Sequence, residues 1–172
     1  KGTALALVKN IMGEGVMLFA SFAMLLNFER FGKMKGMCNI VEWSIRDESV
    51  HVDGLSKLFT TYVQENPKLL NDEFKREVYD IARATVELEN SFVDMTFTLG
   101  EPEGITKEEV KAYVQYITNK RLLGMGMKDI FDVKENPFPW IDTLLSASRV
   151  DNFFERKSSQ YVVVGMTGDW EY

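Results

Sequence analysis

The chain has 172 residues, of which 45% are hydrophobic and 27% are charged. This length and composition suit one folded domain with a buried core, and they exclude a low-complexity polymer or a long disordered tail. With 26 acidic against 20 basic residues, the formal charge is -6. An acidic chain of this kind is not expected to bind nucleic acid or an anionic membrane surface.

The cysteine content and the length of the apolar runs predict a cytoplasmic location. The single cysteine, Cys38, cannot form a disulfide within the chain, and the first residues do not have the layout of a signal peptide. The longest apolar run, residues 15–26, is shorter than the roughly 20 residues that span a bilayer. We therefore expect a soluble, cytoplasmic protein without a membrane partner.

Apolar residues recur three, four or seven positions apart over most of the chain, which predicts an all-α fold. Asn71 is a good helix start, and Thr106 with Glu109 has the spacing of a capping box. Helices this long are typical of bundles, and sustained heptads, which would favour a coiled coil, are lacking. The four long helices are expected at about residues 4–31, 38–64, 71–99 and 106–126.

The pattern changes after the fourth helix. Pro137 and Pro139 fix two backbone dihedrals ahead of a short helix, and residues 148–172 show no sustained period. The sequence therefore predicts a bundle part, residues 1–147, followed by a tail, residues 148–172.

The chain has one histidine, His51, which lies three residues after Glu48 in the second long helix. Positions i and i+3 share one helix face, so the two side chains point the same way and can share a metal ion. The same short pattern also occurs on solvated helix faces. The pair by itself leaves the metal site open.

A further carboxylate, Glu14, interrupts an apolar stretch of the first helix. Such a group must be exposed, paired or metal-bound, because an isolated buried charge is costly. Glu14 lies 18 residues before Gly32 and Glu48 lies 16 after it, so straight antiparallel helices turning at Gly32 place both carboxylates at about the same height. Gly13 and Gly15 beside Glu14 either let the helix deform or allow close packing against a neighbour.

The count of ligands is incomplete for a dinuclear site. A carboxylate-bridged dimetal site in a four-helix bundle takes a carboxylate from each of two helices and a Glu-x-x-His pair from each of the other two. This chain offers one of each, Glu14 and the pair Glu48–His51. Another chain completes the site, or two copies complete it by symmetry, or there is no such site.

Six segments occur in a characteristic order: the stretch from Glu14 to Ala23, Asn27 to Arg30, Arg46 to His51, Tyr113 to Arg121, Asn136 to Trp140, and Asn152 to Arg156 before Tyr161. Together they resemble the second half of the radical-generating small (beta) subunit of class I ribonucleotide reductase. The resemblance covers essentially the whole chain but only about half of a family member.

The resemblance implies a ferritin-like helical bundle around a dinuclear metal centre. The expected centre contains two iron ions, and the alternatives are two manganese ions or one ion of each metal. Glu14, Glu48 and His51 match three metal ligands of the family. Asp47 matches the carboxylate that connects the metal ligands to the radical-transfer route, and Phe22 matches an apolar residue beside the cofactor.

The resemblance also assigns the tail. Tyr161 matches the redox-active tyrosine of the family's flexible tail, and Glu155 matches a glutamate that assists radical transfer between subunits. The last residues would dock on the large subunit, in which ribonucleotides are reduced to deoxyribonucleotides. The completed small subunit is expected to be a dimer.

The family's first-half ligands and its radical tyrosine have no counterpart in this sequence. We therefore expect the N-terminal half of the small subunit on a separate chain. The first alternative is a self-complementing homodimer that acts as a dimetal-carboxylate oxidase or a metal store. The second is a metal-free helical module that binds the large subunit through its tail.

Overall fold

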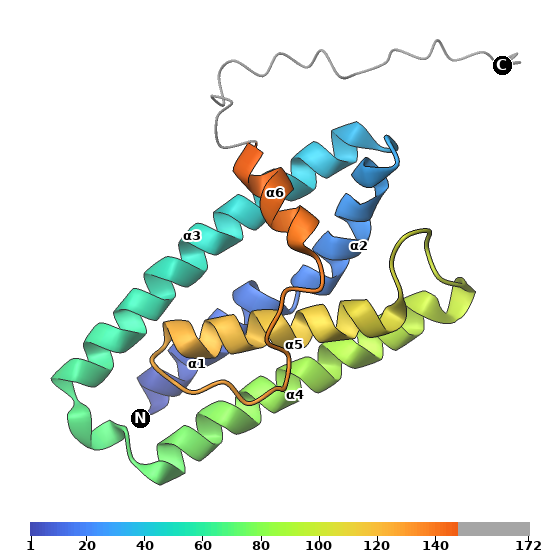
Figure 1. Cartoon of the computed structure of the whole chain (residues 1–172). Coiled ribbons are helices and arrows are strands. Elements are labelled where there is room, and N and C mark those ends of the chain that lie inside the picture. The colour runs from blue at the N-terminus through green and yellow to red at the C-terminus, as the bar shows by residue number, and fades with distance from the viewer. Residues whose placement is uncertain (148–172) are drawn as a thin grey trace, which may run out of the picture.

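The computed structural model describes residues 1–147, and every element in that part is a helix (Figure 1). This confirms the all-α prediction. Residues 148–172, which include Glu155 and Tyr161, lie outside the described residues, so the predicted tail stays a prediction. The helices are, in chain order, α1 (Gly2–Val16), α2 (Phe19–Arg30), α3 (Lys35–Glu65), α4 (Asp72–Thr96), α5 (Lys107–Gly124) and α6 (Pro139–Ala147), with short 3-10 turns at Pro67–Leu69 and Phe97–Leu99.

The first long helix is divided, which corrects the expectation of one continuous helix over residues 4–31. α1 ends at Val16 and α2 begins at Phe19. The N–H of Met17 reaches back to the carbonyl of Met12 at 3.4 Å, one residue further than in a regular α-helix, so the last turn of α1 is widened. Apolar periodicity continues across the break, and for that reason the sequence pattern did not reveal it.

The other long helices agree with the predicted spans to within a few residues. Asn71 accepts a hydrogen bond from the Phe74 N–H at the start of α4. Thr106 and Glu109 form the reciprocal capping box that opens α5. α4 ends at Thr96, three residues short of the predicted limit, since the chain tightens there into a 3-10 turn.

α1 lies at the centre of the arrangement and packs against α3, α4 and α5. Figure 1 shows α3 running back beside α1 and α2, with α4 and α5 side by side against α1. The completely buried side chains of α1 include Val8, Ile11 and Val16. The core therefore forms around the helix that carries Glu14.

By length and composition alone, the stretch from Gly2 to Arg30 is long and apolar enough to cross a membrane. The apolar stretch is therefore longer than residues 15–26, which the sequence pattern indicated. More than half of its most apolar part is buried inside the protein, as in the core helix of a soluble protein. The stretch is interrupted between α1 and α2, and it supplies much of the core.

The chain after α5 folds back along the bundle before α6 begins. The Asn119 side chain is buried; it donates to the Phe131 carbonyl at 2.8 Å and accepts from the N–H groups of Ile130 and Phe131. Phe138 packs on Tyr113, with ring centres 5.2 Å apart. One buried amide thus fixes a segment that has no helix of its own.

Candidate metal centre

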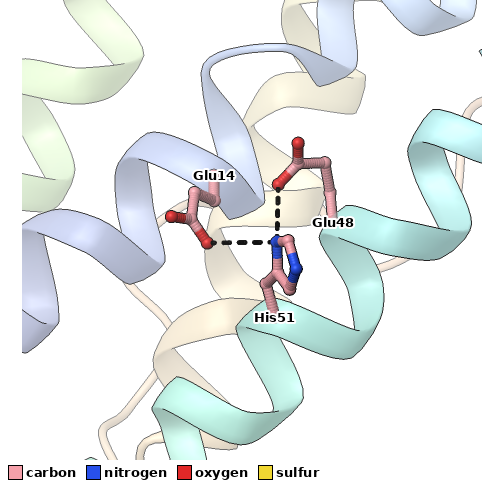
Figure 2. Close-up of side chains that lie close together, drawn as sticks. All are labelled: Glu14, Glu48 and His51. Atoms are coloured by element: carbon pink, nitrogen blue, oxygen red, sulfur yellow. Dashed lines mark ion pairs between the residues drawn. The ribbon is translucent and has the colours of Figure 1, made fainter.

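Glu14, Glu48 and His51 come together on α1 and α3 (Figure 2). His51 Nδ1 lies 3.9 Å from Glu14 Oε2 and 3.7 Å from Glu48 Oε2. One ligand atom from each residue lies within 4.8 Å of the other two. The structure therefore places the three predicted metal ligands in one cluster.

Two levels of structure bring these groups together. Glu48 and His51 share a face of α3 because they are three residues apart in a regular helix. Glu14 faces them because α1 packs beside α3 in the register that the distances from Gly32 predicted. The break in the first helix lies between Glu14 and Gly32, within the stretch over which the register was counted, and the three side chains still meet.

The donor set suits a metal ion. Carboxylate oxygens and an imidazole nitrogen bind iron, manganese and zinc, at roughly 2.0–2.2 Å for zinc. Two ligands of one ion therefore lie up to about 4.3 Å apart, a range that contains both His51 distances. Glu48 Oε2 is buried and has no hydrogen-bond partner among the described residues. A buried carboxylate oxygen without a donor is stabilised by a cation, so the residues present fit the implied metal.

The cluster is open on one side. The side chains of His51 and Glu14 are 60% and 42% exposed. A shallow depression of about 510 Å³ lies over them, and it is lined also by Val50, Gly54 and Leu55. A metal bound here would have room for further ligands from outside the described residues.

Asp47 and Phe22 occupy different surroundings. Asp47 is exposed on α3, one residue before Glu48. Phe22 is buried in α2 and packs edge-to-face on Phe19, with ring centres 5.6 Å apart. The predicted roles of these two residues stay predictions.

Sequence reasoning gave no role to Glu89 and Arg121, which contact the chain just after Glu14. Arg121 Nε donates to the Gly15 carbonyl at 2.9 Å. The Glu89 carboxyl, which is only 4% exposed, lies next to the Ala20 N–H. The sequence did contain a signal for Glu89, because this carboxylate interrupts the apolar stripe of α4. The other positions of that stripe include Val78, Ala82, Val86 and Val93.

Comparison with known proteins identifies the family. The family model described as "Ribonucleotide reductase, small chain" matches residues 1–137. A protein named "probable ribonucleoside-diphosphate reductase small subunit" in Invertebrate iridescent virus 3 is 46% identical over 160 residues, which are 92% of this chain and 43% of that protein. The beta subunit of ribonucleoside-diphosphate reductase from Chlamydia pneumoniae is 29% identical over 92% of this chain and 46% of its own length.

Solved structures agree on the fold. The ribonucleotide reductase R2 subunit from Clostridium botulinum superposes with a TM-score of 0.76 and 26% identity, over 81% of this chain and 44% of that one. The fold is therefore the ferritin-like helical fold of those proteins, as the family resemblance implied. The chain spans about half the length of the curated relatives that it matches. On this evidence the chain belongs to the family of ribonucleotide reductase small chains.

Proposed function

We propose that this chain supplies the C-terminal half of the metal-binding bundle of a ribonucleotide reductase small subunit. The observation that carries the proposal is the cluster of Glu14, Glu48 and His51, a half-set of dimetal ligands on two packed helices of a chain in this family. The relatives are named as reductase small subunits, which favours the same activity in the completed protein.

An exposed stripe on α3 supports completion by a further polypeptide. Ile40, Trp43, Val50 and Leu58 are 57%, 42%, 70% and 54% exposed and follow one another at helical spacing past His51. Apolar side chains gathered on one helix face mark a surface that a partner covers. We propose that the N-terminal half of the small subunit, on a separate chain, packs here and brings the remaining ligands.

Each residue then has a specific task. Glu48 and His51 bind from one face of α3, with His51 presenting Nδ1, and Glu14 binds from α1. A dinuclear centre of iron or manganese would supply the oxidising equivalent that the completed protein passes to the large subunit for ribonucleotide reduction. Asp47, beside Glu48 and exposed on α3, would connect the ligands to the transfer route, with Glu155 and Tyr161 continuing it in the tail.

The metal half of the proposal is tested on the protein in the assembled form isolated from its source. Measurement of the metal content by mass spectrometry should give two metal ions per completed small subunit. Glu48→Gln and His51→Ala should each remove at least one ion or weaken Mn²⁺ binding 100-fold or more, because each deletes a ligand. Glu65→Gln, which changes an exposed carboxylate at the far end of α3, is the matched control. Unchanged metal occupancy in the His51 variant would reject the metal site.

The radical-transfer half needs a different variant. Tyr161→Phe removes only a hydroxyl, so we expect nucleotide reduction with the large subunit to be lost while the metal content stays at the wild-type level. Full turnover by this variant would remove Tyr161 from the transfer route.

The open side of the cluster also fits a second copy of this chain, which favours the homodimeric dimetal protein as the second candidate. Native mass spectrometry separates the two. A different polypeptide together with two metal ions supports the split subunit, whereas a homodimer with two metal ions supports the self-complementing site.

A further inference from the structure

The break between α1 and α2 leaves backbone groups without helical partners close to Glu14. The carbonyls at the end of α1 and the N–H groups at the start of α2 cannot bond one another across the break. Regular bonding resumes with the Phe22 N–H, which donates to the Leu18 carbonyl at 3.0 Å. Met17 and Leu18 at the break are exposed, but Gly15, Val16, Phe19 and Ala20 on either side are buried. Backbone groups of these buried residues need partners from other elements.

Arg121 supplies the partner at the end of α1. Its Nε donates to the Gly15 carbonyl at 2.9 Å across 106 residues of sequence. Its guanidinium carbon lies 5.1 Å from the centre of the Phe19 ring, the first residue of α2. A cation is the favourable charge at a helix C-terminus, so Arg121 both satisfies the carbonyl and matches the dipole of α1.

Glu89 supplies the partner at the start of α2. The Glu89 carboxyl lies next to the N–H of Ala20, the second residue of that helix, and Glu89 Oε2 has no hydrogen-bond partner among the described residues. A carboxyl at a helix N-terminus is the favourable arrangement for both hydrogen bonding and the helix dipole. Glu89 comes from α4 and Arg121 from α5, so the break is held from two separate helices.

Gly15 allows the close approach on which the first contact depends. A Cβ at this position would lie 2.8 Å from Arg121 Nε and 3.1 Å from Val52 Cγ2, both too close. The residue directly after Glu14 is therefore in contact with the side chain that holds the break.

We propose that Arg121 and Glu89 form a two-point clamp on the α1–α2 break and thereby fix the position of the Glu14 carboxylate opposite His51. Both are positioning residues, since neither contacts the metal-ligand cluster. The effect on metal binding rests on the proposed function, whereas the effect on the break does not. Outer partners that orient ligands typically change metal affinity 10- to 100-fold when removed.

The experiment compares four variants of the assembled protein. Arg121→Met and Glu89→Leu remove one clamp contact each, Glu89→Gln keeps an acceptor for the Ala20 N–H, and Lys120→Met changes an exposed neighbour on α5 as the control. We expect hydrogen exchange of the amides at residues 15–22 to be at least 10-fold faster in the first two variants and unchanged in the last two. Mn²⁺ affinity should fall about 10-fold or more in the same two variants.

The hydrogen-exchange rates and the Mn²⁺ affinities together distinguish the ways in which the proposal could be wrong. Unchanged exchange at residues 15–22 in Arg121→Met and Glu89→Leu would overturn the clamp. Faster exchange with unchanged Mn²⁺ affinity would overturn its effect on Glu14. A wild-type protein that binds no Mn²⁺ would reject the proposed function, and the exchange data would still decide whether the clamp exists. If Arg121→Met does not fold, Arg121→Lys replaces it, with faster exchange expected at the same amides because the amine cannot reproduce the Nε geometry.

Discussion

At the scale of single residues, Glu89 shows what burial does to a carboxyl group. Removal from water raises its pKa to about 7, and the hydrogen bond from the Ala20 N–H opposes this shift only in part. The folded protein therefore holds a proton on Glu89 between about pH 4.5 and pH 7, where the unfolded chain does not. The stability that this proton contributes is complete below pH 4.5 and is lost as the pH rises through about 7.

This linkage predicts the behaviour of Glu89→Gln. The amide keeps the acceptor for Ala20 and cannot ionise, so the variant should match the wild type near pH 5 and exceed it at pH 8 by up to about 3 kcal/mol in the free energy of unfolding. Denaturant unfolding at both pH values measures the difference. The prediction is wrong if wild type and variant lose the same stability between pH 5 and pH 8.

Gly15 and Gly13 form a second comparison of single residues. A methyl group at Gly15 would collide with Arg121 and Val52, whereas no atom lies within 4 Å of the corresponding position at Gly13. We expect Gly15→Ala to lower the free energy of unfolding by about 1–2 kcal/mol through overpacking, and Gly13→Ala to leave it unchanged or raise it by up to about 1 kcal/mol. Equal effects in denaturant unfolding would show that Gly15 is not packed as described.

At the scale of elements, the chain between α5 and α6 depends on one side chain. Asn119 makes three hydrogen bonds to the backbone of Ile130 and Phe131, and it is only 5% exposed. Asn119→Ala leaves those backbone groups without their partner, so we expect a loss of about 2–3 kcal/mol in the free energy of unfolding. Hydrogen exchange at residues 130–131 should accelerate more than exchange within α4. A uniform change over the whole chain would argue against this local role.

At the scale of the whole molecule, the exposed stripe on α3 predicts how the chain behaves alone and in its assembly. Val50 is 70% exposed beside His51, so we expect the isolated chain to bind apolar dyes and to self-associate. Val50→Lys should reduce both effects and weaken association with the partner proposed to complete the bundle 10-fold or more, because assembly would bury the charge. Leu88→Lys, at a 60% exposed position on α4, is the control. A monodisperse isolated chain that binds no dye would contradict the docking role of the stripe.

The sequence by itself determined the features that depend on neighbours along the chain. Helical periodicity, the Asn71 cap and the Thr106–Glu109 capping box are local, so the second, third and fourth long helices were predicted with small errors at their ends. The common face of Glu48 and His51 is equally local, because it follows from a spacing of three residues.

Only the tertiary structure decided what depends on contacts between helices. It divided the first helix, where the groups that the break leaves unpaired find partners on α4 and α5. It brought Glu14 to 3.9 Å from His51, a distance that the register could suggest but that side-chain packing sets. It also raised the pKa of Glu89, since the energetic cost of a carboxylate depends on the water removed around it, and that is a property of the packed core.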